Sequence, residues 1–343
     1  MYILILVAVG LLLTEISVRI FFPAPLYKLR NDESEQIVPH PLVSYIYQPN
    51  LDFIIHTKNY STRIEINSYG YRDDAWQPVD SIPSILVVGD SYTAGQGVGV
   101  ERRYSSQLEY LFDESPEIQI FNAGVSGYGL PQMINTVRIH QPLLSPDIVI
   151  MGVYISGLPR ISDPFIYHQG FSVRRSQVKH TQVHHHNAYL VLSTSPFLRK
   201  IEILLLRFSA LYQNIVSRVS GLNYRRIPQP THLDNLATIT PDLAQLAEEL
   251  TSHGSILLVL TIIQHDKKGN FNVDELNAAQ RLSTICDSLD IPLISITYHL
   301  EQAVEEGESF RIDENDPHWN DRAHALAAQA LYDWITRNRT TSP

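Results

Sequence analysis

The chain has 343 residues and is 44% hydrophobic, which suits one large α/β domain with attachments better than two equal domains. Its formal net charge is −10, and without a basic block it is a poor match for nucleic acid, because phosphate binding requires clustered Lys and Arg. The single cysteine, Cys286, excludes both an intramolecular disulfide and a cysteine-based metal site.

The N-terminus is strongly apolar. No charge occurs between Met1 and Leu13, and Glu15 and Arg19 follow at a spacing that lets them pair on one helix face. A bilayer-spanning helix needs roughly 20 mostly apolar residues. We therefore expect residues 1–22 to form a single-pass transmembrane anchor that attaches the protein to a membrane, with the rest of the chain extracytoplasmic. A cleaved signal peptide and a buried helix are the alternatives.

Residues 23–80 are typical of a juxtamembrane segment followed by a small β-rich region. Apolar strands then alternate with helices, which predicts a parallel sheet covered on both faces. The expected strands are 85–88, 118–121, 147–154, 256–263 and 291–296. The expected helices are 104–112, 131–140, 241–253, 273–289 and 320–335.

An irregular insertion at about 158–240 interrupts this alternation. It contains a histidine cluster, His180 and His184 to His186, and an apolar helical pattern over 195–216. The histidines could bind a metal, but no acid or cysteine follows at a regular ligand spacing, so a solvated loop is the default. For the apolar helix, packing on the core or on a partner is the default, and capping of a site or membrane contact are the alternatives.

Small and polar residues follow three of the expected strands. Gly89, Asp90 and Ser91 come directly after the first, 122–127 after the second and 154–157 after the third. In parallel sheets, ligands bind beyond the carboxyl ends of the strands. The three loops are therefore expected to converge on one rim.

A serine hydroxyl becomes an effective nucleophile only when a base takes its proton and donors stabilise the resulting oxyanion. His318 precedes the last expected helix and can return to the same rim as Ser91. Asp316 lies two residues earlier, on the same side of an extended segment, and could orient the imidazole. Asp313 is the alternative acid. Such a serine alone is commonly a turn residue, but the joint placement predicts nucleophilic catalysis.

Three segments resemble the sequence blocks of the SGNH, or GDSL, hydrolases. The segment GDSYTAGQGV is similar to the first block, NAGVSG to the second and DPHWNDRAHALAA to the last. Upstream, INSYGYRDD and the charged pair in the apolar N-terminus are similar to membrane-anchored bacterial members. The resemblance implies a three-layer α/β/α, flavodoxin-like fold, with 81–340 as the hydrolase-like domain.

The resemblance also implies roles for single residues. Ser91 would be the nucleophile, His318 the base, and the N–H groups of Ser91 and Gly127 an oxyanion hole. Members of the family usually add an Asn side chain after the third strand, but Ser156 stands in that position. The Ser156 hydroxyl could donate instead, and Asn122 is another substitute or a brace of the second loop. Because loss of one donor costs about 10²–10³ in rate, the departure predicts a slow enzyme, another donor or altered chemistry.

These residues together predict a serine esterase that removes a small acyl group from a carbohydrate or lipid ester. This chemistry requires no metal and no organic cofactor. The same residues in an O-acyltransferase for surface polysaccharide would deliver the acyl group to a sugar hydroxyl. A catalytically degraded glycan-binding or assembly protein is the non-enzymatic alternative. A nucleotide site is disfavoured, because neither G-x-G-x-x-G nor a P-loop motif occurs.

Overall fold

The computed structural model describes most of the chain. The described residues are 2–21, 36–56, 60–112, 118–168, 171–176, 183–184, 190–191, 197–198, 201, 204–205, 208–212, 214–215 and 232–339. The chain divides into two compact units. One is formed by Met1–Ile37 with Phe165–Gln229, and the other by Val38–Pro164 with Pro230–Pro343.

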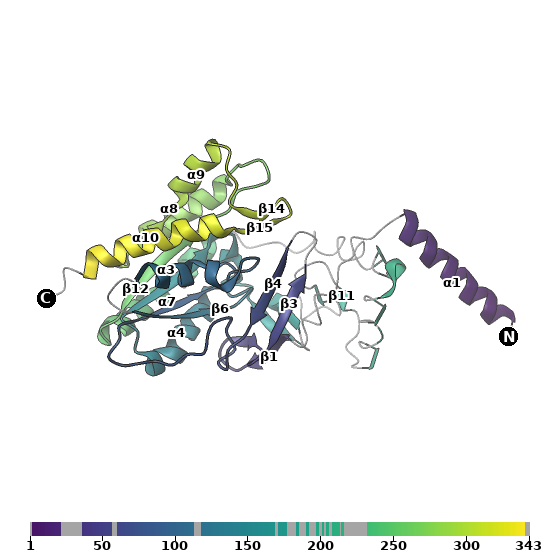
Figure 1. Cartoon of the computed structure of the whole chain (residues 1–343), viewed down its shortest axis with the longest axis horizontal. Coiled ribbons are helices and arrows are strands. Elements are labelled where there is room, and N and C mark those ends of the chain that lie inside the picture. Colours follow the sequence, from purple (N-terminus) through teal and green to yellow (C-terminus); the bar gives the residue numbers. More distant parts are fainter. Residues whose placement is uncertain are drawn as a thin grey trace. The chain divides into compact units, whose positions relative to one another are not determined.

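A five-stranded parallel sheet forms the centre of the larger unit (Figure 1). Its strands are β5 (Ser84–Gly89), β6 (Gln119–Gly124), β7 (Ile148–Tyr154), β12 (Ile256–Ile262) and β13 (Leu293–Ser295). They lie in the order β13-β12-β7-β5-β6. Numbered along the chain, this is the 2-1-3-4-5 order of flavodoxin-like folds. The prediction of a parallel α/β sheet is confirmed.

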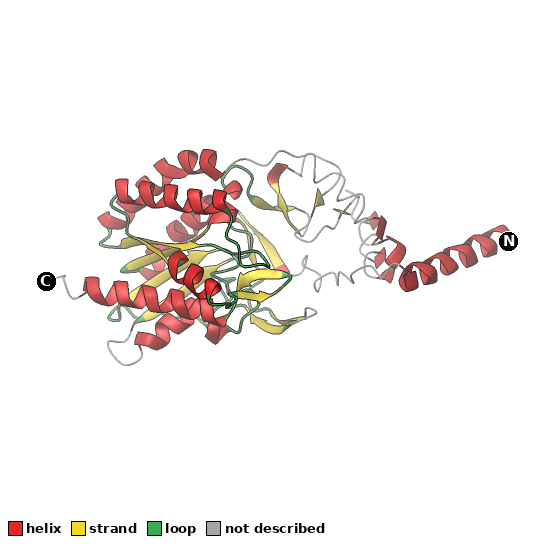
Figure 2. Ribbon diagram, turned by 90° about the horizontal axis from the view of Figure 1, so that it is seen from above, coloured by secondary structure: helices red, strands yellow, loops and turns green. Residues whose placement is uncertain are grey.

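Helices cover both faces of this sheet (Figure 2). They are α3 (Tyr104–Phe112), α4 (Leu130–Leu144), α7 (His232–Ser252), α8 (Val273–Ser288), α9 (Thr297–Glu305) and α10 (Asp321–Arg339). On β5, Ile85 and Val87 belong to a buried cluster that includes side chains of α3, α9 and α10. Leu86 and Val88 point to the opposite face, where α4 contacts β5 and β7, and α7 contacts β12.

Two helices and one hairpin differ from the sequence expectation. Helix α7 begins at His232, so Pro241, taken as its first residue, lies inside the helix. Helix α9 and a hairpin of β14 (Arg311–Asp313) and β15 (Asp316–Trp319) were not predicted. Each is nine residues long or shorter, and so short a segment shows little hydrophobic periodicity.

The β-rich region before the sheet consists of two hairpins. One is formed by β1 (Ile37–His40) and β2 (Ser44–Tyr47). The other is formed by β3 (Asp52–His56) and β4 (Ser61–Glu65), paired antiparallel from Asp52–Glu65 to His56–Ser61. Alternate residues of β4 are buried, as expected for a strand with one face on the core.

The smaller unit contains α1 (Tyr2–Phe21), in which Glu15 and Arg19 form the expected pair at 2.9 Å. The Glu15 carboxylate also accepts the backbone N–H groups of Ala210 and Leu211, at 2.7 and 3.1 Å. Of the helices in the described part of the chain, none, α1 included, is both long and apolar enough to cross a bilayer. The transmembrane anchor expected at 1–22 is therefore not found among the described helices.

Four short strands lie in the described part of the insertion. They are β8 (Phe165–His168), β9 (Phe171–Arg174), β10 (Val183–His184) and β11 (Leu190–Val191). His184 lies in β10, whereas His180, His185 and His186 lie outside the described residues. Of residues 195–216, where an apolar helix was expected, twelve are described and eleven of these are helical. Within the described ranges, no three His, Cys, Asp or Glu side chains are grouped so as to hold a metal ion.

Two buried histidines of the larger unit make its stability depend on pH. Burial lowers the pKa of His324, which stacks on Tyr104, to about 3. Burial likewise lowers the pKa of His140, whose Nε2 lies 2.8 Å from the Tyr71 hydroxyl, to about 4. Both values lie below the ordinary 6.5, so the unfolded chain binds more protons as the pH falls from 6.5 towards 4.

We therefore expect the free energy of unfolding to fall over this window by up to about 1.4 kcal/mol per pH unit for each histidine. Urea unfolding between pH 7 and pH 4.5 measures this slope. A His140→Gln variant should have a shallower slope, and His253→Gln, at an exposed position, serves as the control. Equal slopes for the wild type and His140→Gln would contradict the prediction.

Candidate active site

Ser91 lies directly beyond the carboxyl end of β5, where the buried strand turns into a loop. The preceding Asp90 is completely buried, and its Oδ1 accepts the Tyr92 N–H at 3.0 Å. The turn is closed by hydrogen bonds from Ala94 N–H to Asp90 O and from Gln96 N–H to Ser91 O, both 2.9 Å long. The backbone around Ser91 is therefore held by local hydrogen bonds.

Ser91, His318 and Asp316 form a continuous hydrogen-bonded row. His318 Nε2 lies 2.8 Å from Ser91 Oγ, and His318 Nδ1 lies 2.5 Å from Asp316 Oδ1. Asp316 and His318 both belong to β15, where a spacing of two residues places side chains on the same side of a strand. The imidazole can therefore accept the serine proton while the carboxylate orients the ring.

Asp313, the alternative acid, has a structural role instead. Its Oδ1 accepts the backbone N–H groups of Asn315 and Asp316, at 2.5 and 3.0 Å. These bonds close the turn between β14 and β15. The carboxylate that contacts His318 is that of Asp316.

Asp316 is held as an anion by its neighbours. Burial acts to raise the pKa of Asp316, but hydrogen bonds from His318 and Tyr60 lower it to about 2. The Tyr60 hydroxyl donates to Asp316 Oδ2 at 2.9 Å. Sequence reasoning missed Tyr60, because it precedes β4, 256 positions before Asp316, and no motif or periodicity connects the two.

We expect Tyr60→Phe to reduce kcat for ester hydrolysis about tenfold, which corresponds to about 1.4 kcal/mol. Without the hydroxyl, Asp316 loses a donor that stabilises its charge, so the pKa of Asp316 rises and the carboxylate orients the imidazole less firmly. The pH–rate profile of kcat measures both effects. Tyr110→Phe, at a position 76% exposed, is the control, and an unchanged kcat in Tyr60→Phe would refute the role.

The backbone N–H groups of Ser91 and Gly127 are the expected oxyanion donors. Ser91 and Gly127 follow the paired strands β5 and β6, and neither N–H group donates to any residue that the structure describes. Gly127 has a φ of +86°, a conformation that favours glycine. The preceding Ser126 is held by Tyr45, whose hydroxyl donates to Ser126 O, and by Tyr47, whose hydroxyl donates to Ser126 Oγ. Both N–H groups are thus available to an oxyanion.

Ser156, expected as a third donor, is engaged elsewhere. Its Oγ donates to Glu275 Oε1 at 2.5 Å, so the hydroxyl hydrogen is not available to an oxyanion and the expected role is not supported. The Asn122 amide is also occupied, because it donates to Thr93 O and Ser105 Oγ, at 2.9 and 2.7 Å. Asn122 therefore braces the second loop.

Tyr92 forms the wall against which the imidazole packs. The centroids of the Tyr92 and His318 rings are 4.8 Å apart. The buried Tyr92 hydroxyl donates to Gln264 Oε1 at 3.1 Å and to Pro317 O at 3.2 Å. Tyr92 thus links the loop that follows β5 and contains Ser91, residues 90–98, to the strand that carries the acid and the base. This loop is called the nucleophile loop below.

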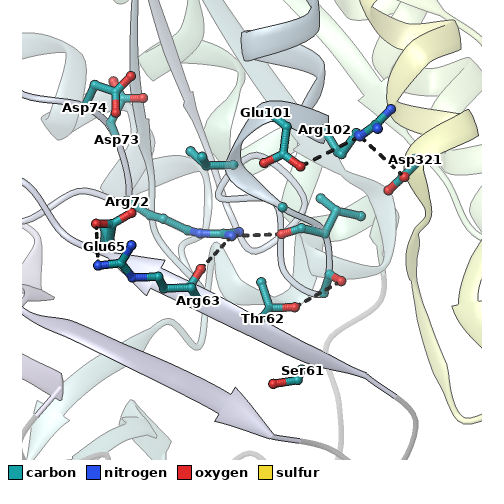
Figure 3. A pocket seen from close by; sticks show the side chains of 14 residues that line it. Ser61, Thr62, Arg63, Glu65, Arg72, Asp73, Asp74, Glu101, Arg102 and Asp321 are labelled. Atoms are coloured by element: carbon teal, nitrogen blue, oxygen red, sulfur yellow. Dashed lines mark hydrogen bonds and ion pairs between the residues drawn. The ribbon is translucent and has the colours of Figure 1, made fainter.

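A hollow of about 440 Å³ lies beside the loop that follows Ser91 (Figure 3). The buried Arg72 forms part of its wall and donates to the carbonyl oxygens of Ala94, Gly95 and Val98. A single side chain from the region before the sheet therefore fixes three carbonyl groups of the nucleophile loop.

A second hollow, of about 530 Å³, reaches Pro317 on β15, between the acid and the base. Its walls carry amides, both signs of charge and one aromatic ring, and include Gln264, Lys267, Asn270, Asn272, Glu275, Arg311 and Phe271. Pockets of 300–1,000 Å³ accommodate small molecules. This hollow is therefore suited to a small polar group, and it meets the strand of the acid and the base at Pro317.

No protein-family model and no curated protein sequence matches this chain. Among solved structures, it is similar to TesA, with 14% identity and a TM-score of 0.45, covering 74% of this chain and 98% of that one. It is also similar to a lipolytic G-D-S-L family protein from Veillonella parvula, with 13% identity, a TM-score of 0.41 and coverage of 74% and 98%. The acetyl xylan esterase AlAXEase matches with 14% identity, a TM-score of 0.38 and coverage of 74% and 99%.

Proposed function

We propose that this protein is a serine esterase that removes a small acyl group from a carbohydrate. The row of Ser91 Oγ, His318 and Asp316, with contacts of 2.8 and 2.5 Å, is the observation that carries the proposal. A nucleophile, a base and an orienting carboxylate in mutual contact are what acyl transfer through a serine requires.

In the first half of the reaction, Ser91 Oγ attacks the ester carbonyl carbon while His318 Nε2 takes the hydroxyl proton. The N–H groups of Ser91 and Gly127 donate to the oxyanion of the tetrahedral intermediate. Asp316, kept ionised by the low pKa described above, stabilises the imidazolium. His318 then gives the proton to the leaving alcohol oxygen, and the acyl group remains on Ser91.

In the second half, water attacks the acyl carbonyl and His318 accepts its proton. A second tetrahedral intermediate forms at the same two N–H groups. Its collapse returns the proton to Ser91 Oγ and releases the carboxylic acid. These steps regenerate the starting protonation states.

The second hollow supports a carbohydrate rather than a lipid as the alcohol part of the ester. Its amides and charged groups offer donors and acceptors to hydroxyl groups, and Phe271 offers an apolar surface to a sugar ring. A long alkyl chain would offer these groups neither donors nor acceptors.

The test combines active-site labelling with turnover. We expect a fluorophosphonate probe to label the wild-type protein, with the adduct on Ser91 by mass spectrometry. We also expect a higher kcat/KM on an acetylated methyl glucoside than on cyclohexyl acetate, which has a ring of the same size without hydroxyls. A folded wild-type protein that is neither labelled nor active on esters would refute the esterase. Product carrying the acyl group on an added glycan would instead identify an O-acyltransferase.

A further inference from the structure

We propose that Arg160 is a positioning residue that sets the spacing between the two backbone donors of the oxyanion hole. The inference rests on the proposed esterase function and adds a residue to the same site. It starts from the third loop, the 3₁₀ helix η2 (Ile155–Arg160), which follows β7 and ends at this arginine.

One nitrogen of Arg160 joins the two loops that carry the donors. Nη1 donates to Asp90 Oδ2 at 2.6 Å and to the Tyr128 carbonyl oxygen at 3.0 Å. Asp90 directly precedes Ser91, and Tyr128 directly follows Gly127. The guanidinium therefore holds the neighbour of each donor and links the first loop to the second.

The ion pair is buried, which makes this link stiff. The side chains of Arg160 and Asp90 are 10% and 0% exposed. The other Asp90 oxygen accepts the Tyr92 N–H, so this carboxylate is held from two sides. In a site with little water, such charge-assisted hydrogen bonds are strong and resist displacement.

The local sequence leaves room for the guanidinium. A Cβ atom at Gly157 would lie 3.3 Å from Arg160 Nη1, and one at Gly129 would lie 2.7 Å from Arg160 Cβ. Larger residues at these two positions would displace the arginine. The third loop therefore contributes the Arg160 clamp, meaning its two hydrogen bonds to Asp90 and Tyr128. It does not contribute the Ser156 hydroxyl, which donates to Glu275.

The expected signature is a loss in kcat. The donors bind an oxygen that carries its charge only in the transition state, so their spacing affects kcat and not ground-state binding. A displacement of 1 Å within a catalytic site can cost about 10²-fold in rate. A role limited to stability would instead lower the melting temperature and leave the kcat of the folded protein unchanged.

The main variants are Arg160→Met and Arg160→Lys, and the control is Arg138→Met. Arg138 of α4 also forms an ion pair, with Glu249 of α7 at 2.8 Å, and makes no hydrogen bond to Asp90 or Tyr128. All are assayed with p-nitrophenyl acetate below their melting temperatures. Phenylboronic acid, which forms a tetrahedral anionic adduct with serine, is used as the inhibitor.

For Arg160→Met we expect kcat to fall about 10²-fold with an unchanged KM, and phenylboronic acid to bind more weakly by a similar factor. Arg160→Lys, which keeps a cationic donor nitrogen, should retain more activity. Arg138→Met should keep its kcat and its affinity for phenylboronic acid. An equal loss of kcat in both methionine variants would overturn the positioning role.

A double variant keeps the test decisive if Arg160→Met does not fold. Arg160→Met with Asp90→Asn removes the uncompensated buried charge and keeps an acceptor for the Tyr92 N–H. It should recover the melting temperature but not kcat, and recovery of both would overturn the proposal. A wild type without label or turnover would refute the esterase itself, whereas an active wild type with an unimpaired Arg160→Met would refute only the clamp.

Discussion

Ser91→Ala is expected to lower kcat for ester hydrolysis by about 10⁵–10⁶-fold while the protein stays folded. The methyl group cannot attack a carbonyl, and the hydrogen bond of 2.8 Å to His318 is lost. What remains is the catalysis from the two backbone donors and from substrate binding. Steady-state kinetics on p-nitrophenyl acetate measure the loss, and Ser252→Ala, at an exposed position on α7, is the control.

His318→Ala should cost nearly as much, because without a base the serine keeps its proton. The double variant Ser91→Ala/His318→Ala should be no slower than the worse single variant, since the two residues act as one unit. Losses that multiply in the double variant would mean that the two side chains act independently. That result would contradict the shared proton transfer proposed for them.

The second large effect is expected for Asp316→Asn, which should reduce kcat by about 10⁴-fold. An amide in place of the carboxylate favours the wrong tautomer of His318 and no longer stabilises the imidazolium. Asp313→Asn is the matched control, because its side-chain carbonyl can still accept the N–H groups of Asn315 and Asp316. The two substituted residues lie three positions apart in the chain. Comparing the variants therefore shows which of the two candidate acids acts on His318.

The measurement is kcat on p-nitrophenyl acetate across pH for both variants. A large loss in Asp313→Asn with little effect in Asp316→Asn would reverse the assignment. Comparable losses in both would show that the turn closed by Asp313 matters as much as the carboxylate on the imidazole.

The sheet was predictable because its strands are short apolar runs that alternate with helical segments. Strand β5 is buried at all six positions, and the change to Gly89, Asp90 and Ser91 marks its end. The predicted placement of Ser91 on the rim follows from that pattern alone. The N-terminal anchor predicted at 1–22 has no counterpart among the described helices that could span a membrane.

Residues that act through distant contacts could not be found from the sequence. Tyr60 and Arg160 each reach a partner far away in the chain, and nothing near them signals that partner. Ser156 was misjudged because the position of Glu275, 119 residues later, decides where its hydroxyl points. The hairpin of β14 and β15 could not be predicted, because its strands have only three and four residues and β15 contains Pro317.

The acid and the base share a single strand of that hairpin, which constrains how the site can open. Any backbone movement that shifts β15 carries Asp316 and His318 together, so their mutual contact persists while both leave Ser91. Local opening of the hairpin would therefore move the proposed acid and base away from Ser91 together. The imidazole would keep its orientation, and its hydrogen bond to the serine would form again when the hairpin closes.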